Sequence, residues 1–186
     1  MDTAFIKGVV VPILTPIDGE ERIDEARFRR QIDYVISGGL EGILLFGSNG
    51  EFYQVEEEEM ERGLAIALAQ AAGRVPVYFG VGAINTKKCV RLAKMAAAKG
   101  AAAVSVLQPM FLKPSEAELY RHFETIAAAI PETPVLIYNN PGRVGYGLTA
   151  ASIGQAAHQV PNIVGMKDTS GDITLTEESD RLGRDV

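Results

Sequence analysis

The sequence predicts an α/β protein built from repeated βα units around a parallel sheet. Short runs rich in β-branched and aromatic residues recur roughly every 30 residues, the length of one strand, one helix and two loops. These runs are almost continuously apolar, which is typical of strands covered on both faces. The segments between them have the apolar spacing and terminal signals of helices.

Six segments are predicted as strands. They begin at Gly8 (GVVVPILTP), Gly42 (GILLFGS), Val75 (VPVYFGVG), Ala101 (AAAVSVLQP), Pro134 (PVLIYNNP) and Asn162 (NIVGMKDT). A helical segment follows a strand each time. We therefore expect a sheet in which the strands run parallel to one another.

The first helix is predicted within residues 23–39. It has acidic residues in its first turn, and it ends at the glycine pair 38–39. One of its faces is apolar and carries Phe28, Ile32, Val35 and Ile36. The acidic run 56–60 predicts the first turns of a second, solvated helix.

Two further helices are predicted from their end signals. Thr86 is expected as the N-cap of a helix that stops at Gly100. Ser115 and Glu118 have the spacing of a capping box at the start of a helix over residues 115–130.

Composition favours an ordinary globular protein, and we expect one domain over residues 1–186. The chain is 47% apolar and 23% charged, and its net charge of −6 argues against a nucleic-acid partner. Its single cysteine, Cys89, allows no disulfide within the chain, and its two distant histidines do not predict a metal site. Without a long apolar stretch or a signal segment, we expect a cytoplasmic protein with no membrane partner.

A strict βα repeat has two main solutions, an open doubly wound sheet or a closed (β/α)₈ barrel. In both, ligands bind at the carboxyl ends of the strands. Lys167 stands at the end of the sixth predicted strand, where an apolar interior would favour its neutral amine. A neutral amine is a nucleophile suited to imine formation with a carbonyl substrate.

Other strand ends carry groups that suit an oxo acid. The GSNGE turn at residues 47–51 sets a hydroxyl and an amide between two glycines, where the backbone can approach a carboxylate. Tyr138 offers a phenol that can relay protons, and Arg143 offers a guanidinium that can bind a second carboxylate.

The motifs GVVVPILTP, GSNGE, YNNPGR and GMKD occur in this order along the whole chain. In this order and spacing, the sequence resembles the dihydrodipicolinate synthase and N-acetylneuraminate lyase family of class I, Schiff-base aldolases. The resemblance implies the TIM (β/α)8-barrel fold, with only six βα units present in this chain. It also implies a homo-oligomer, commonly a homotetramer, and no cofactor, since the lysine supplies the electron sink.

The same resemblance assigns roles to site residues. Lys167 matches the Schiff-base lysine, and Tyr138 matches the proton-relay tyrosine. Ser48 and Asn49, in the turn that begins at Gly47, match the pair that holds the carboxylate of bound pyruvate. Arg143 matches the arginine that contacts the second substrate in the synthases and that typical sialic acid lyases lack.

Two departures bear on the substrate. The synthases carry two tyrosines where this chain has Met110 and Phe111, and one of those tyrosines completes a hydroxyl relay in a neighbouring subunit. They also more often carry two threonines at the positions of Ser48 and Asn49. Both differences favour a 2-keto-3-deoxy acid or 4-hydroxy-2-oxoglutarate type aldolase over dihydrodipicolinate synthase.

The third departure is length, because a complete barrel has about 250 residues. We expect a fragment of a longer pyruvate-dependent lyase whose last two βα units are missing. A non-catalytic remnant that oligomerises or binds a ligand is the alternative, and a flavodoxin-like nucleotide-binding domain is a third reading.

Overall fold

The computed structural model describes residues 1–183, and within them six strands form one sheet in the order β1-β2-β3-β4-β5-β6. Every neighbouring pair of strands is parallel. A doubly wound sheet reverses its strand order at a switch point, whereas this sheet never does. The chain therefore forms part of a β/α barrel, as the sequence resemblance implies.

The strands are short and coincide with the six predicted segments. Their bounds are β1 Val10–Pro12, β2 Gly42–Leu45, β3 Val77–Val81, β4 Ala103–Leu107, β5 Val135–Asn139 and β6 Ile163–Asp168. All residues of β2, β3 and β4 are buried, whereas β1 and most of β6 are only partly buried. The difference arises because β1 and β6 are the two edges of the sheet.

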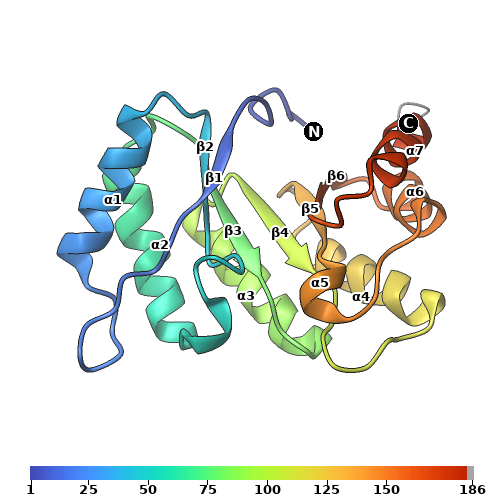
Figure 1. The fold of residues 1–186 in the computed structure, drawn as a ribbon, viewed down its shortest axis with the longest axis horizontal. Coiled ribbons are helices and arrows are strands. Elements are labelled where there is room, and N and C mark those ends of the chain that lie inside the picture. Colours follow the sequence, from blue (N-terminus) through green and yellow to red (C-terminus); the bar gives the residue numbers. More distant parts are fainter. Residues whose placement is uncertain (184–186) are drawn as a thin grey trace.

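A helix follows every strand, and two short helices lie in the loops. The bounds are α1 Glu25–Ser37, η1 Phe52–Gln54, α2 Glu57–Ala71, α3 Thr86–Lys99, α4 Glu116–Ala128, α5 Pro141–Val144, α6 Ala150–Gln159 and α7 Ile173–Gly183. In Figure 1 the helices form an arc around the sheet, from α1 and α2 on one side through α3 and α4 to α6 and α7 on the other. The short helices η1 and α5 were not predicted.

The main core lies between the sheet and this arc of helices. Strand residues such as Ile43, Phe79 and Ile137 belong to one large buried cluster with residues from the helices, including Phe28 and Ile32 of α1. The opposite face of the sheet carries a second, smaller cluster. It contains Leu44, Tyr78 and Ala103, with Phe5 and Ile6 of the N-terminal segment packed against them.

The helix ends confirm the predicted capping box and correct one predicted cap. Ser115 and Glu118 make both hydrogen bonds of the capping box at α4. At α3, however, the N-cap is Asn85, whose side chain accepts from the Lys88 backbone N–H. The Thr86 hydroxyl lies 2.8 Å from His122 Nδ1 instead. The prediction of Thr86 was wrong because Asn is at least as good a cap and the hydroxyl has a tertiary partner.

The second helix begins with the predicted acidic turn, but the helix is less solvated than expected. Met60 is buried, and Glu59 accepts from the Ile23 backbone N–H. No helix within residues 1–183 is both long and apolar enough to cross a membrane.

Candidate active site at the carboxyl ends of the strands

The carboxyl ends of β2, β5 and β6 bring three of the predicted site residues together. Tyr138 and Lys167 are paired in the register of β5 and β6, and the Lys167 Nζ lies 3.6 Å from the centroid of the Tyr138 ring. Ser48, three residues beyond β2, has its Oγ 3.2 Å from the Tyr138 hydroxyl. An amine, a phenol and an aliphatic hydroxyl are therefore in direct contact.

A bulge in β6 sets the side to which Lys167 points. Val135 pairs with Ile163, but the next residue, Leu136, pairs with Gly165, so that one residue of β6 is passed over. Because side chains alternate between the two faces of a strand, this extra residue changes which side chain of β6 lies beside Tyr138. Without it, Tyr138 would be paired with Met166.

The turn that carries Ser48 is held by close backbone contacts. Phe46 adopts a left-handed conformation at φ 50°, and its ring packs edge-on against Phe79 at 5.4 Å. The Thr15 hydroxyl donates a 2.7 Å hydrogen bond to the Gly50 carbonyl. A Cβ at Gly80 would lie 2.4 Å from the Phe46 carbonyl oxygen, so the next strand must have glycine there for the turn to fit.

The surroundings of Tyr138 lower the pKa of its phenol. Burial by itself raises the pKa of the phenol, but the hydrogen bond with Ser48 and the positive charge of Lys167 lower it. Together with a smaller contribution from Thr169, they hold the pKa of Tyr138 below its usual value. The phenol is therefore suited to giving up and regaining a proton.

Two buried amides that the sequence analysis did not single out support this site. The Asn140 Nδ2 donates a 2.7 Å hydrogen bond to the Tyr138 hydroxyl oxygen. Gln108, at the end of β4, accepts from the Asn140 backbone N–H at 3.0 Å and donates to the Tyr146 carbonyl at 2.7 Å. The signal in the sequence was an amide directly after β4 and another directly after β5, but amides at strand ends are also ordinary turn formers.

A second pair of polar groups fixes the end of β6 to β5. Asn139 is fully buried, its Nδ2 donates a 2.6 Å hydrogen bond to Asp168, and its Oδ1 accepts from the Leu148 backbone N–H at 3.1 Å. Asp168 also accepts from the backbone N–H and the hydroxyl of Ser170. Asp168 is therefore a structural partner of Asn139 and lies directly next to Lys167 in the chain.

Other predicted residues are less enclosed than expected. Lys167 is only partly buried, because β6 is an edge strand of the sheet. Asn49 is exposed in the turn that begins at the buried Gly47. Arg143 lies on α5 with an exposed side chain, five residues after Tyr138.

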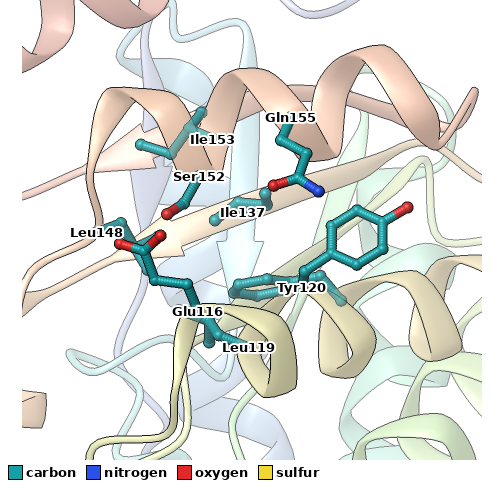
Figure 2. A pocket seen from close by; sticks show the side chains of 9 residues that line it. Glu116, Leu119, Tyr120, Ile137, Leu148, Ser152, Ile153 and Gln155 are labelled. Atoms are coloured by element: carbon teal, nitrogen blue, oxygen red, sulfur yellow. The ribbon is translucent and has the colours of Figure 1, made fainter.

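Two small hollows lie on opposite sides of the sheet. The first is about 10 Å³, room for roughly one water molecule, and is lined by Ser48, Gly80, Ser105 and Tyr138 among others. The second lies between α4 and α6 over Ile137 of β5, with Tyr120 and Gln155 at its sides (Figure 2). Ile137 and Tyr138 are successive residues of one strand, so this second pocket lies on the face away from the candidate site.

The fold and this arrangement define a partial β/α barrel with an amine and a phenol at its carboxyl end. The chain belongs to the dihydrodipicolinate synthetase family, whose model matches residues 5–185. It is 41% identical over 174 residues to the 4-hydroxy-tetrahydrodipicolinate synthase of Salinibacter ruber, a match that covers 94% of this chain and 57% of that enzyme. The chain thus spans little more than half the length of this relative.

Two solved structures of related proteins share the fold of this chain. YagE, a prophage protein of E. coli K12 solved in complex with pyruvate, is 31% identical with a TM-score of 0.91, over 96% of this chain and 59% of YagE. A sialic acid aldolase of Ruminococcus gnavus, solved as a catalytic lysine mutant, is 26% identical with a TM-score of 0.86, over 93% of this chain and 56% of the aldolase.

Proposed function

We propose that this chain carries the Schiff-base site of a pyruvate-dependent lyase that forms or cleaves a carbon–carbon bond between pyruvate and an aldehyde. The Lys167 amine attacks C2 of pyruvate, and loss of water gives an iminium ion. Removal of a C3 proton then gives an enamine. In the forming direction, the enamine adds to the aldehyde carbon, and hydrolysis of the new iminium releases the product and the free amine.

The other site residues act around this lysine. Ser48 and Asn49 hold the carboxylate of pyruvate, so that its carbonyl lies within reach of the amine. Tyr138 gives a proton to the aldehyde oxygen as the bond forms and takes it back during cleavage. Arg143 contacts the acidic group of the second substrate.

The observation that carries this proposal is the contact of Lys167 with Tyr138, together with the hydrogen bond between Tyr138 and Ser48. A surface lysine paired with a neighbouring acid would not need this arrangement. The pyruvate bound in YagE and the catalytic lysine of the Ruminococcus enzyme also support it, since both proteins share the fold of this chain.

Two kinds of reaction are candidates for this site, a synthase reaction and an aldolase reaction. The Salinibacter relative is a 4-hydroxy-tetrahydrodipicolinate synthase, which supports synthesis of this compound. An aldolase for 2-keto-3-deoxy acids or 4-hydroxy-2-oxoglutarate is favoured by Ser48 and Asn49. It is also favoured by Phe111, whose side chain has no hydroxyl and is 87% exposed. Assays for the formation of 4-hydroxy-tetrahydrodipicolinate and for the cleavage of these two kinds of keto acid separate the two reactions.

Borohydride trapping tests the lysine. The purified chain is treated with pyruvate and sodium borohydride, and its peptides are then analysed by mass spectrometry. We expect a pyruvate-dependent reduced adduct on Lys167 that is lost in Lys167→Ala and kept in the control Lys113→Arg. A folded chain without an adduct, or with adducts spread evenly over surface lysines, would contradict the proposal.

A groove beside the edge strand β6 supports the alternative, a non-catalytic remnant that oligomerises or binds a ligand. The groove has a volume of about 780 Å³ and is lined by residues of α6, β6, α7 and the loop before β6, and by Thr3 of the N-terminal segment. Sizing of the purified chain, combined with the trapping experiment, distinguishes the two proposals. Discrete oligomers, tetramers included, that bind pyruvate without forming an adduct would support the remnant.

A further inference from the structure

Asn140 occupies the N-cap position of α5, yet its side chain does not cap that helix. An N-cap Asn normally accepts a hydrogen bond from a backbone N–H in the first turn. Here the Nδ2 donates to the Tyr138 hydroxyl oxygen at 2.7 Å, and Asn140 is 7% exposed. The side chain thus makes a hydrogen bond with Tyr138 in place of the local cap.

The backbone of Asn140 is held in place on both sides. Its N–H donates to Gln108 Oε1 at 3.0 Å, and its carbonyl accepts from the backbone N–H groups of Arg143 and Val144 at 3.1 and 3.0 Å. Gln108 is itself 1% exposed. The donor therefore reaches the phenol from a rigid position, which is what a group that stabilises a developing charge requires.

An amide NH₂ only donates, so the Tyr138 oxygen must accept from Asn140. In the neutral phenol, this leaves the O–H free to donate to Ser48 Oγ or to a substrate oxygen. In the phenolate, Asn140 and Ser48 can both donate to the same oxygen. Lys167 is the charged group that the structure places against the ring, while Asp168 is turned toward Asn139 and Ser170.

We propose that Asn140 is a positioning residue that stabilises the Tyr138 phenolate and directs its proton toward Ser48 and the substrate. This inference rests on the proposed function, because it gives the proton-relay tyrosine a fixed partner from within the same chain. It adds Asn140 to the site and makes Gln108 the residue that holds it.

The test is a titration of the Tyr138 phenol by ultraviolet absorbance. Each protein is compared with the same protein carrying Tyr138→Phe, so that the difference reports this one phenol. The variants are Asn140→Asp, which keeps the size and removes the donor, and Asn140→Leu. We expect both to raise the pKa of Tyr138 and to lower the phenolate fraction at a fixed pH about tenfold. The aspartate should have the larger effect, because it adds a like charge.

The control is Asn85→Ala, which removes the side-chain cap of α3 far along the chain. It should lower the melting temperature without moving the titration. If a folded Asn140→Asp protein titrates like the original chain, the inference is wrong. Borohydride trapping on the same samples is read separately, since a missing adduct in the original chain contradicts the Schiff-base proposal and leaves the titration result standing.

Discussion

Lys167 and Tyr138 occupy paired positions on adjacent parallel strands, with the Lys167 Nζ 3.6 Å from the centroid of the Tyr138 ring. The contact is fixed by the backbone pairing of β5 and β6 rather than by a loop. A site built on paired strands is held more accurately than one on loops, and this accuracy suits chemistry that passes protons over short distances.

Replacing Tyr138 with phenylalanine should separate imine formation from later proton transfer. The variant keeps the ring beside Lys167 and loses the oxygen that Ser48 and Asn140 contact. We expect the pyruvate adduct to persist, while turnover with an aldehyde falls about a hundredfold or more. Steady-state rates together with borohydride trapping measure both steps. Tyr34→Phe, at an exposed position on α1, is the control, and unchanged turnover in Tyr138→Phe would remove the phenol from the mechanism.

His122 should make the chain sensitive to acid. Burial lowers the pKa of this imidazole from 6.5 to about 4. As the pH falls from 6.5 to about 4, the imidazole therefore binds a proton in the unfolded chain but not in the folded chain. Stability from the neutral histidine is complete above pH 6.5 and is lost through this window, by about 3 kcal/mol.

Urea unfolding of the original chain and of His122→Leu at pH 7 and pH 4.5 measures this loss. Carboxylates titrate equally in both proteins, so the difference between them isolates the histidine. We expect His122→Leu to lose clearly less stability on acidification. Equal losses in the two proteins would show that the imidazole takes up its proton in the folded state.

A methyl group at position 80 should disturb the Ser48 turn. In Gly80→Ala, the Cβ would lie 2.4 Å from the backbone oxygen of Phe46, which is not the end of a flexible side chain. We expect a loss of about 1 to 3 kcal/mol in stability and weaker pyruvate labelling. Gly147→Ala is the matched control, since its Cβ would meet only Pro141 at an ordinary 3.8 Å. Thermal melts of both variants measure the loss of stability, and equal stabilities would refute the steric argument.

Removal of the Asn139 side chain should loosen the end of β6. Asn139→Ala leaves the Leu148 N–H and one oxygen of Asp168 without their partner. The expected cost is about 2 to 3 kcal/mol, since a buried N–H and a partly buried carboxylate oxygen lose their hydrogen bonds. Thr149→Ala, which removes the side-chain cap of α6, should cost about 1 kcal/mol. Denaturant unfolding compares them, and a smaller loss at Asn139 than at Thr149 would contradict the structural role.

Much of the fold could be predicted from local signals. The βα repeat, the six strand segments and the capping box at Ser115 depend on residues close together in the chain, and all agree with the structure. The cap of α3 was misplaced because the tertiary contact between Thr86 and His122 has no local signature. The short helix α5 was missed for a similar reason, since a single turn has too few residues to show a period.

The sequence by itself determined the class of repeat and the residues at the strand ends, because apolar runs and end signals are local properties. The tertiary structure decided which of those residues meet. One extra residue in β6 pairs Lys167, rather than Met166, with Tyr138. Side-chain alternation then puts the amine on the same face of the sheet as the phenol. Strand register depends on pairing between segments far apart in the chain, and no local pattern in either segment specifies it.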